Sequence, residues 1–183
     1  MLYDLSRADA RVKWLVTCLL LTFALAYGFG GWMVALYAGF GPKQVAATYA
    51  PSRMSMAMPP ESTVVVEHPM TMSQFAEAAP HQVDTALLVQ DTHVHVPMYG
   101  VIAACLSVVV LGLRMSRRAA LGTISLLFAA PWLDFLGMWL TKFLAPGFAW
   151  LTIVGGWAMA AGLVIVTVMA LWQMWLMKER TVS

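Results

Sequence analysis

Two histidines with a single residue between them stand in the stretch LVQDTHVHVPMYGV, which runs from Leu88 to Val101. Imidazole nitrogens are common metal ligands, and a thioether follows at Met98. In an extended strand, His93 and His95 share one face, because strand side chains alternate with a period of two. In a helix the two rings point about 200° apart, so only one can face a bundle. The stretch therefore predicts a two-histidine metal site in one conformation and a single inward-facing histidine in the other.

The position of Pro97 is compatible with both conformations. If a helix begins near Asp91 or Thr92, the carbonyl of His93 loses its helical partner, because proline has no N–H, and the span is kinked. If the helix begins at Val96 instead, proline occupies its first turn, where it is favoured. The second arrangement leaves an extended His-x-His element before a shorter span, and both rings could then bind one metal ion.

Asp134 is the only acidic residue within a predicted membrane span. A carboxylate in hydrocarbon costs about 2.5 kcal/mol or more, so such a residue usually faces the interior of a bundle and has a partner. Counting about 1.5 Å per helical residue from the short connection between the second and third spans, Asp134 lies within roughly 6 Å of His95 along the membrane normal. One interpretation is a carboxylate that orients a metal-bound imidazole. The other is a buried aspartate bonded to threonine, tryptophan or water, with no cofactor.

The segment between the first two spans is rich in thioether and imidazole groups. The runs MSMAMPP and EHPMTM contain Met54, Met56, Met58, His68, Met70 and Met72. Histidine and thioether ligands together favour copper, above all Cu(I), over zinc or magnesium. A copper site could draw on them together with His93, His95 and Met98. Asp134 would then support a bound histidine. Methionine is also a flexible apolar filler, and the chain contains 14 methionines.

Haem b is a second possible cofactor. Haem between helices needs an axial histidine and usually a second axial ligand, which is histidine or methionine. His95 could supply the first, with Met33 or Met138 from neighbouring spans at a suitable depth. A site with two intramembrane histidines is not expected, because the predicted spans contain no other histidine.

The bulk composition indicates which elements position these groups. Apolar residues make up 61% of the 183 residues and charged residues 11%, against roughly half and a quarter in globular proteins. Apolar segments long enough to cross a hydrocarbon core, which needs about 20 helical residues, occur at about 14–40, 94–113, 120–142 and 148–176. Short connections between the last three require antiparallel neighbours. We predict one membrane domain over 1–183, an all-α, up-down four-helix transmembrane bundle whose 41–92 loop carries short amphipathic helices.

Glycine and alanine mark places where these helices can approach closely. They are Gly28, Gly30 and Gly31 in the first span and Gly155, Gly156, Ala160 and Gly162 in the fourth. Small residues allow the backbones of membrane helices to come into contact. We therefore expect both groups to lie at interfaces between helices.

The basic residues set the expected orientation. Eight of the eleven flank the predicted spans on one side, namely Arg7, Arg11, Lys13, Arg114, Arg117, Arg118, Lys178 and Arg180. Because lysine and arginine resist translocation, we expect both termini in the cytoplasm and the 41–92 loop in the periplasm of a bacterial inner membrane. An apolar run that continues to Phe40 favours a retained anchor over a cleaved signal peptide. The basic residues form no single stripe and do not favour a nucleic-acid partner.

This combination resembles a group of small bacterial, mostly proteobacterial, four-span membrane proteins of unassigned function. In that group the second span opens with a Thr-His-x-His element, matched here by Thr92 to His95. The third span carries an aspartate before a Trp-Leu-Thr-Lys-like end, matched by Asp134 and by Trp139 to Phe143. A glycine pair like Gly155 and Gly156 occurs in the fourth. The resemblance implies the architecture and marks the same histidines and aspartate, but it implies no reaction.

Two functions fit these residues. The first is an accessory integral membrane subunit of a periplasm-facing redox complex, which holds copper or haem at the periplasmic mouth of the bundle. The second is a structural or assembly subunit of a larger membrane complex, without a cofactor. An independent enzyme is not expected, because the sequence has no phosphate loop, dinucleotide fingerprint, nucleophile elbow or HExxH motif. Lipid and other membrane subunits are the expected partners.

Overall fold

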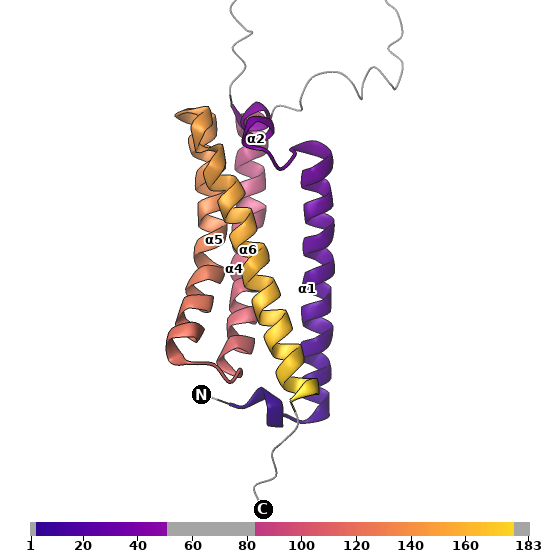
Figure 1. The fold of residues 1–183 in the computed structure, drawn as a ribbon. Helices are drawn as coiled ribbons and strands as arrows, with labels where there is room; N and C mark the ends of the chain where they lie inside the picture. The colour runs from indigo at the N-terminus through magenta and orange to yellow at the C-terminus, as the bar shows by residue number, and fades with distance from the viewer. Residues whose placement is uncertain (1–2, 51–82, 178–183) are drawn as a thin grey trace, which may run out of the picture.

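The computed structural model describes residues 3–50 and 83–177, which form a helical bundle. Its helices are α1 (Ala10–Tyr37), α2 (Pro42–Tyr49), α4 (Thr85–Leu111), α5 (Arg117–Phe143) and α6 (Ala149–Leu171), with the short turns η1 (Leu5–Arg7) and η2 (Pro146–Phe148) and the π-helical extension η3 (Trp172–Leu176). Four of these helices, the last extended by η2 and η3, are long and apolar enough to cross a membrane. They alternate in direction (Figure 1), which confirms the predicted up-down four-helix transmembrane bundle.

The two ends of the bundle are built from different elements. At one end, called here the α2 end, α2 lies beside the start of α4; at the other, the termini end, lie η1, η3 and the connection between α4 and α5 (Figure 1). α1 stands to one side, and α6 crosses the bundle from α5 at the α2 end to α1 at the termini end. The indole of Trp175 in η3 accordingly donates to the hydroxyl of Thr17 in α1 at 3.1 Å. α6 with its extension is therefore the helix that ties α1 to the others.

The second membrane helix begins earlier than its apolar run. α4 starts at Thr85 instead of near residue 94, because the carboxylate of Asp84 caps it by accepting from a backbone N–H of the first turn at 2.6 Å. Leu88 is fully buried and packs against α5, so these first turns also gain packing energy. Residues 85–92 therefore belong to α4 and not to the loop, and Pro97 lies inside a continuous helix.

The beginning of the predicted 41–92 loop is also helical. α2 has Pro42 at its first position, where proline is favoured, and the side chain of Gln44 accepts from the N–H of Gly41 at 3.0 Å. Val45 and Thr48 are buried, so one face of this short helix packs on the bundle. The proposed ligands of the remaining loop, Met54, Met56, Met58, His68, Met70 and Met72, lie outside the described residues.

Glycines bring α5 and α6 into backbone contact. A Cβ atom added to Gly155 would lie 2.5 Å from the backbone nitrogen of Asp134. One added to Gly137 would meet the backbone nitrogen of Thr152, and the Cβ position of Gly162 lies 3.0 Å from a leucine side chain of α5. The prediction that fourth-span glycines lie at a helix interface is therefore confirmed for Gly155 and Gly162.

The glycines of the first span have different surroundings. Within the described part of the chain, nothing lies within 4 Å of the Cβ positions of Gly28, Gly30 and Gly31. The buried residues of α1 are Val16 and Leu20, which lie nearer the termini end. The predicted interface at the α1 glycines is therefore wrong for the described chain, because α1 packs on the bundle through Val16, Leu20 and Tyr27 and not through its glycines.

Polar contacts at the termini end join three parts of the chain. The backbone N–H of Leu5 donates to the carbonyl of Gly112 at 2.9 Å. The guanidinium of Arg114 donates to the carboxylate of Asp4 at 2.7 and 3.1 Å, and these bonds lower the pKa of Asp4 to about 2. The side chain of Gln173 accepts from the backbone N–H of Arg114 at 2.7 Å and donates to its carbonyl at 3.3 Å. The N-terminal segment, the end of α4 and η3 are thereby held together.

Replacing Gln173 by leucine should destabilise this end of the bundle. Gln173 is only 3% exposed, and the change removes its two hydrogen bonds to the backbone of Arg114. A polar group shielded from water and left unsatisfied costs about 1–3 kcal/mol, so we expect a loss of roughly 2–4 kcal/mol in the free energy of unfolding. Unfolding in detergent, followed by circular dichroism, measures this loss. Gln173→Glu keeps the acceptor and loses the donor, and its stability should lie between the two; equal stability of all three proteins would contradict this role.

Candidate functional site

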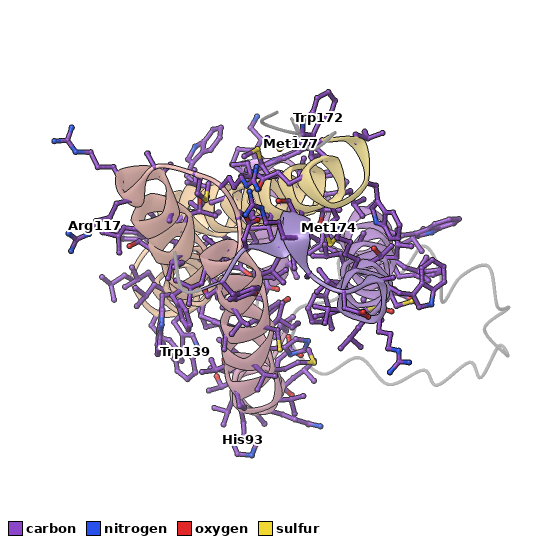
Figure 2. All side chains as sticks on the ribbon, turned by 90° about the horizontal axis from the view of Figure 1, so that it is seen from below. His93, Arg117, Trp139, Trp172, Met174 and Met177 are labelled. Carbon is purple, nitrogen blue, oxygen red and sulfur yellow. The ribbon has the colours of Figure 1, made fainter. Side chains whose placement is uncertain are left out.

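The helical conformation of α4 separates the two histidines of the His-x-His element. Because the helix is continuous from Thr85 to Leu111, the rings of His93 and His95 project about 200° apart. His93 is exposed and lies at the outer edge of the bundle, pointing away from the other helices (Figure 2), whereas His95 is half-buried. The extended arrangement, in which both rings bind one metal ion, does not occur in this structure. Of the two rings, only that of His95 is partly buried against the bundle, and it is the one that remains a candidate ligand.

The imidazole of His95 is held by the preceding turn of α4. Its Nδ1 lies 2.8 Å from the backbone carbonyl oxygen of Asp91 and 3.3 Å from the carboxylate of the same residue. A carbonyl oxygen can only accept, so Nδ1 carries the proton and donates it. In the neutral imidazole the lone pair is then on Nε2, the arrangement typical of a histidine that binds a metal through this nitrogen.

Side chains from three other helices lie near Asp134 of α5. They are Tyr27 of α1, Tyr49 of α2, and His95 and Tyr99 of α4, all within electrostatic range of the carboxylate. These five residues are called the Asp134 cluster below. The cluster lies towards the α2 end, and it is the one place where an acidic residue is found inside a predicted span.

The carboxylate of Asp134 makes no hydrogen bond to any of the described residues. Its backbone carbonyl accepts from the hydroxyl of Thr152 at 3.4 Å, but this contact does not involve the charge. Between Asp134 and His95 the described chain has no direct hydrogen bond or ion pair, so the two interact through space. A half-buried carboxylate at this depth is costly when it has no partner.

α2 brings Tyr49 into the cluster from the end of the bundle. The carbonyl of Thr48 accepts from the backbone N–H of Val83 at 3.0 Å, which ties α2 to the start of α4. Burial raises the pKa of Tyr49 to about 12, and the negative charges of Asp134 and Asp91 act in the same direction. The Tyr49 hydroxyl is therefore neutral throughout the physiological range and keeps its proton as a hydrogen-bond donor.

Two further hydrogen bonds hold the helices around the cluster. The indole Nε1 of Trp139 in α5 donates to the hydroxyl of Thr92 in α4 at 3.0 Å. The hydroxyl of Tyr27 in α1 donates to the carbonyl of Gly156 in α6 at 2.5 Å. The first bond joins α5 to α4 and the second joins α1 to α6, so both connect helices that contribute residues to the cluster or lie beside it.

The methionines considered as ligands lie in different surroundings. Met98 is 45% exposed on α4, about one turn from His95. Met33 is 63% exposed on α1, whereas Met138 is 6% exposed and enclosed in an apolar cluster with Leu88. Across residues 3–50 and 83–177, no three histidine, cysteine, aspartate or glutamate side chains form a group that could hold a metal ion. A metal at His95 would therefore need further ligands from methionine, from the rest of the chain or from a partner.

The three tyrosines of the Asp134 cluster are the functional candidates that sequence reasoning missed. Tyr99 follows His95 by one helical turn, and the two ring centroids are 5.9 Å apart. This spacing could have indicated Tyr99 if the segment had been taken as a helix. Tyr27 and Tyr49 come from separate segments and carry no such local signal. Only the tertiary structure brings them to Asp134.

Comparison with known proteins identifies the chain at the level of the family. No curated protein sequence and no solved structure is significantly similar to it. The family Aq_1264_TM, described as a transmembrane helical domain, matches residues 39–181. This range covers more than three quarters of the chain and includes every residue of the Asp134 cluster except Tyr27. The protein therefore belongs to the Aq_1264_TM family of transmembrane helical domains.

Proposed function

We propose that the protein is an accessory integral membrane subunit of a periplasm-facing redox complex, and that His95 holds a copper ion at the periplasmic mouth of the bundle. The orientation of the imidazole is the observation that carries this proposal. Nδ1 donates to the carbonyl of Asp91 at 2.8 Å, which leaves the lone pair of Nε2 for a metal ion. His93, by contrast, points away from the bundle (Figure 2).

Two neighbouring groups favour copper as the ion. Met98 follows His95 by three residues, a spacing at which helical side chains are neighbours, and it is partly exposed. An imidazole and a thioether together suit copper, above all Cu(I). The carboxylate of Asp134 lies within electrostatic range of His95 and would stabilise positive charge beside it.

Haem fits the same geometry less well. A haem bound through His95 would usually need a second axial ligand. Met138 is enclosed in an apolar cluster, and Met33 lies on a largely exposed part of α1. Copper is therefore the cofactor that we propose, and haem is the competing outcome of the experiment below.

The basic residues support the orientation in this proposal. At the termini end lie Arg7, Arg11, Lys13, Arg114, Arg117 and Arg118. Only Lys43 and Lys142 of the described basic residues lie at the α2 end. Because basic flanking residues stay in the cytoplasm, the α2 end would face the periplasm of a bacterial inner membrane.

Metal analysis of the detergent-purified protein tests this function. After incubation with copper and removal of the excess, the wild type should retain a stoichiometric amount of copper, and His95→Ala should lose most of it. His93→Ala is the matched control, because it removes the same ring from the exposed side of α4 and should retain the metal. An absorption spectrum of the same samples detects haem. A Soret band that is present in the wild type and lost in His95→Ala would show that the cofactor is haem and not copper. Equal copper content in the two variants would overturn the metal site.

A structural or assembly subunit is the second candidate, and one observation favours it. Large apolar side chains of α1, among them Leu25, Phe29 and Trp32, are mostly exposed in the described structure. The neighbouring glycines of α1 have open space beside them, so another membrane helix could approach closely. A colourless, metal-free protein that purifies within a defined membrane complex would support this function instead.

A further inference from the structure

A groove between α4 and α5 is separate from the proposed metal ligand. Its volume is about 230 Å³. α4 contributes Tyr99 and Gly100 to its walls, and α5 contributes Phe128, Trp132 and Phe135. The only polar side-chain atoms of its lining are the Tyr99 hydroxyl oxygen and the Trp132 indole nitrogen. The groove therefore suits an apolar ligand with few polar atoms.

The groove exists because α4 has a glycine at position 100, which has no side chain to fill this space. A Cβ atom at Gly100 would have nothing within 4 Å in the described structure. On the opposite wall, Pro131 has no N–H and interrupts the hydrogen-bond ladder of α5. Phe128 and Trp132 are 42% and 58% exposed, so the groove opens to the outside of the bundle. In a membrane, this outside is lipid.

The groove also lies at the depth of the hydrocarbon core. Its α5 wall runs from Leu127 to Phe135, about 15–27 Å from the start of that helix at Arg117. α5 is roughly 40 Å long by the same measure, and a hydrocarbon core is about 30 Å thick. A ligand therefore enters this groove from the lipid phase and not from water.

We propose that the groove binds the ring of a lipid-soluble quinone, a planar carbonyl-bearing ring with an apolar tail. An apolar cavity of about 150 Å³ can bind benzene, so about 230 Å³ accommodates a ring with substituents. Aromatic rings pack favourably on the faces and edges of other rings. Four of them line this groove: Tyr99, Phe128, Trp132 and Phe135. The apolar tail would leave between the exposed Phe128 and Trp132 into lipid.

A phospholipid acyl chain is the alternative occupant, and two features favour the quinone over it. A flexible chain gains no specific packing from four aromatic walls, whereas a planar ring does. Tyr99 also supplies a hydroxyl that can donate to a ring carbonyl and that an acyl chain cannot use. The Tyr99 ring lies 5.9 Å from both the His95 and the Phe135 rings, so a bound quinone would lie next to the Asp134 cluster.

Quinone binding by the full-length protein in nanodiscs tests this proposal. The probe is a benzoquinone with a decyl tail, and the readout is probe bound per chain above that of protein-free nanodiscs. Gly100→Leu adds a side chain to the groove wall at a position where a Cβ atom meets nothing within 4 Å, and it should weaken binding at least about tenfold. Gly122→Leu is the matched control, because its Cβ position on α5 is equally open but does not line the groove. Trp132→Leu removes one aromatic wall at an exposed position, so it should lower the affinity without filling the space.

Saturable binding by the wild type and Gly122→Leu, weakened in Gly100→Leu and Trp132→Leu, would support the quinone site. Equal binding by all four proteins would refute it. The quinone site would also be refuted if no saturable quinone uptake were found and phospholipid were the only ligand extracted from the protein. Copper content separates this proposal from the metal site, because Gly100→Leu should retain copper and His95→Ala should retain quinone.

Discussion

Gly155→Ala should lower the free energy of unfolding by about 1–3 kcal/mol or more. The new methyl carbon would lie 2.5 Å from the backbone nitrogen of Asp134, 2.8 Å from its Cα and 2.9 Å from the carbonyl oxygen of Ala130. These are backbone atoms of α5 and cannot rotate away, so α5 and α6 must separate along their length. Unfolding in detergent, followed by circular dichroism, measures the loss.

The next residue provides the control. Gly156 also lies in α6, but nothing in the described structure lies within 4 Å of its Cβ position. Alanine has a higher helix propensity than glycine by roughly 0.8–1 kcal/mol, so Gly156→Ala should be neutral or stabilising. Of the two adjacent glycines, only Gly155 is thus expected to lose stability on replacement by alanine. If both variants are equally stable, the close contact of α5 and α6 at Gly155 is wrong.

Asp134→Asn should stabilise the bundle by about 1–2 kcal/mol, although it changes the centre of the candidate site. The carboxylate is half-buried within a membrane helix and makes no hydrogen bond to the described residues. Asparagine has nearly the same shape and removes the charge, so the desolvation cost falls while the packing is kept. The measurement is unfolding in detergent of metal-free protein, since a bound cation would offset the cost in the wild type.

Asp91→Asn is the matched control for this prediction. The Asp91 side chain is about half exposed, so its charge remains hydrated and its replacement should change stability by less than about 0.5 kcal/mol. A loss of stability in Asp134→Asn would show that the carboxylate has a structural partner. A gain, together with weaker copper binding, would show that the charge is retained for function at the expense of stability.

The sequence by itself determined that the chain crosses a membrane four times in alternating directions. Crossing is a local property, because each apolar segment of about 20 residues must satisfy its own backbone hydrogen bonds as a helix. The short connections around residues 114–116 and 144–148 then require antiparallel neighbours. Asp134 could be identified from the sequence for the same local reason. A carboxylate within an apolar run is visible in the sequence whatever the packing of the helices.

The choice between the two histidines depended on where α4 begins. The apolar run suggests a start near residue 94, but the Asp84 cap and the burial of Leu88 extend the helix to Thr85. Only after the segment is known to be helical does the 200° separation place His93 outside and His95 inside. Hydropathy could not show this, because the start of α4 depends on the Asp84 cap and on the burial of one residue, Leu88, and not on a continuous apolar run.

Only the tertiary structure decided which residues meet Asp134 and which glycines form contacts. Tyr27 lies near the aspartate because its hydroxyl bonds to Gly156 of α6, and Tyr49 because α2 packs on α5 and α6. Gly155 is buried, while Gly156 beside it is partly open. In water, an apolar stripe would reveal the inward face of a helix. In lipid both faces are apolar, since lipid tails are as apolar as leucine, so the pattern of residues does not distinguish core from surface.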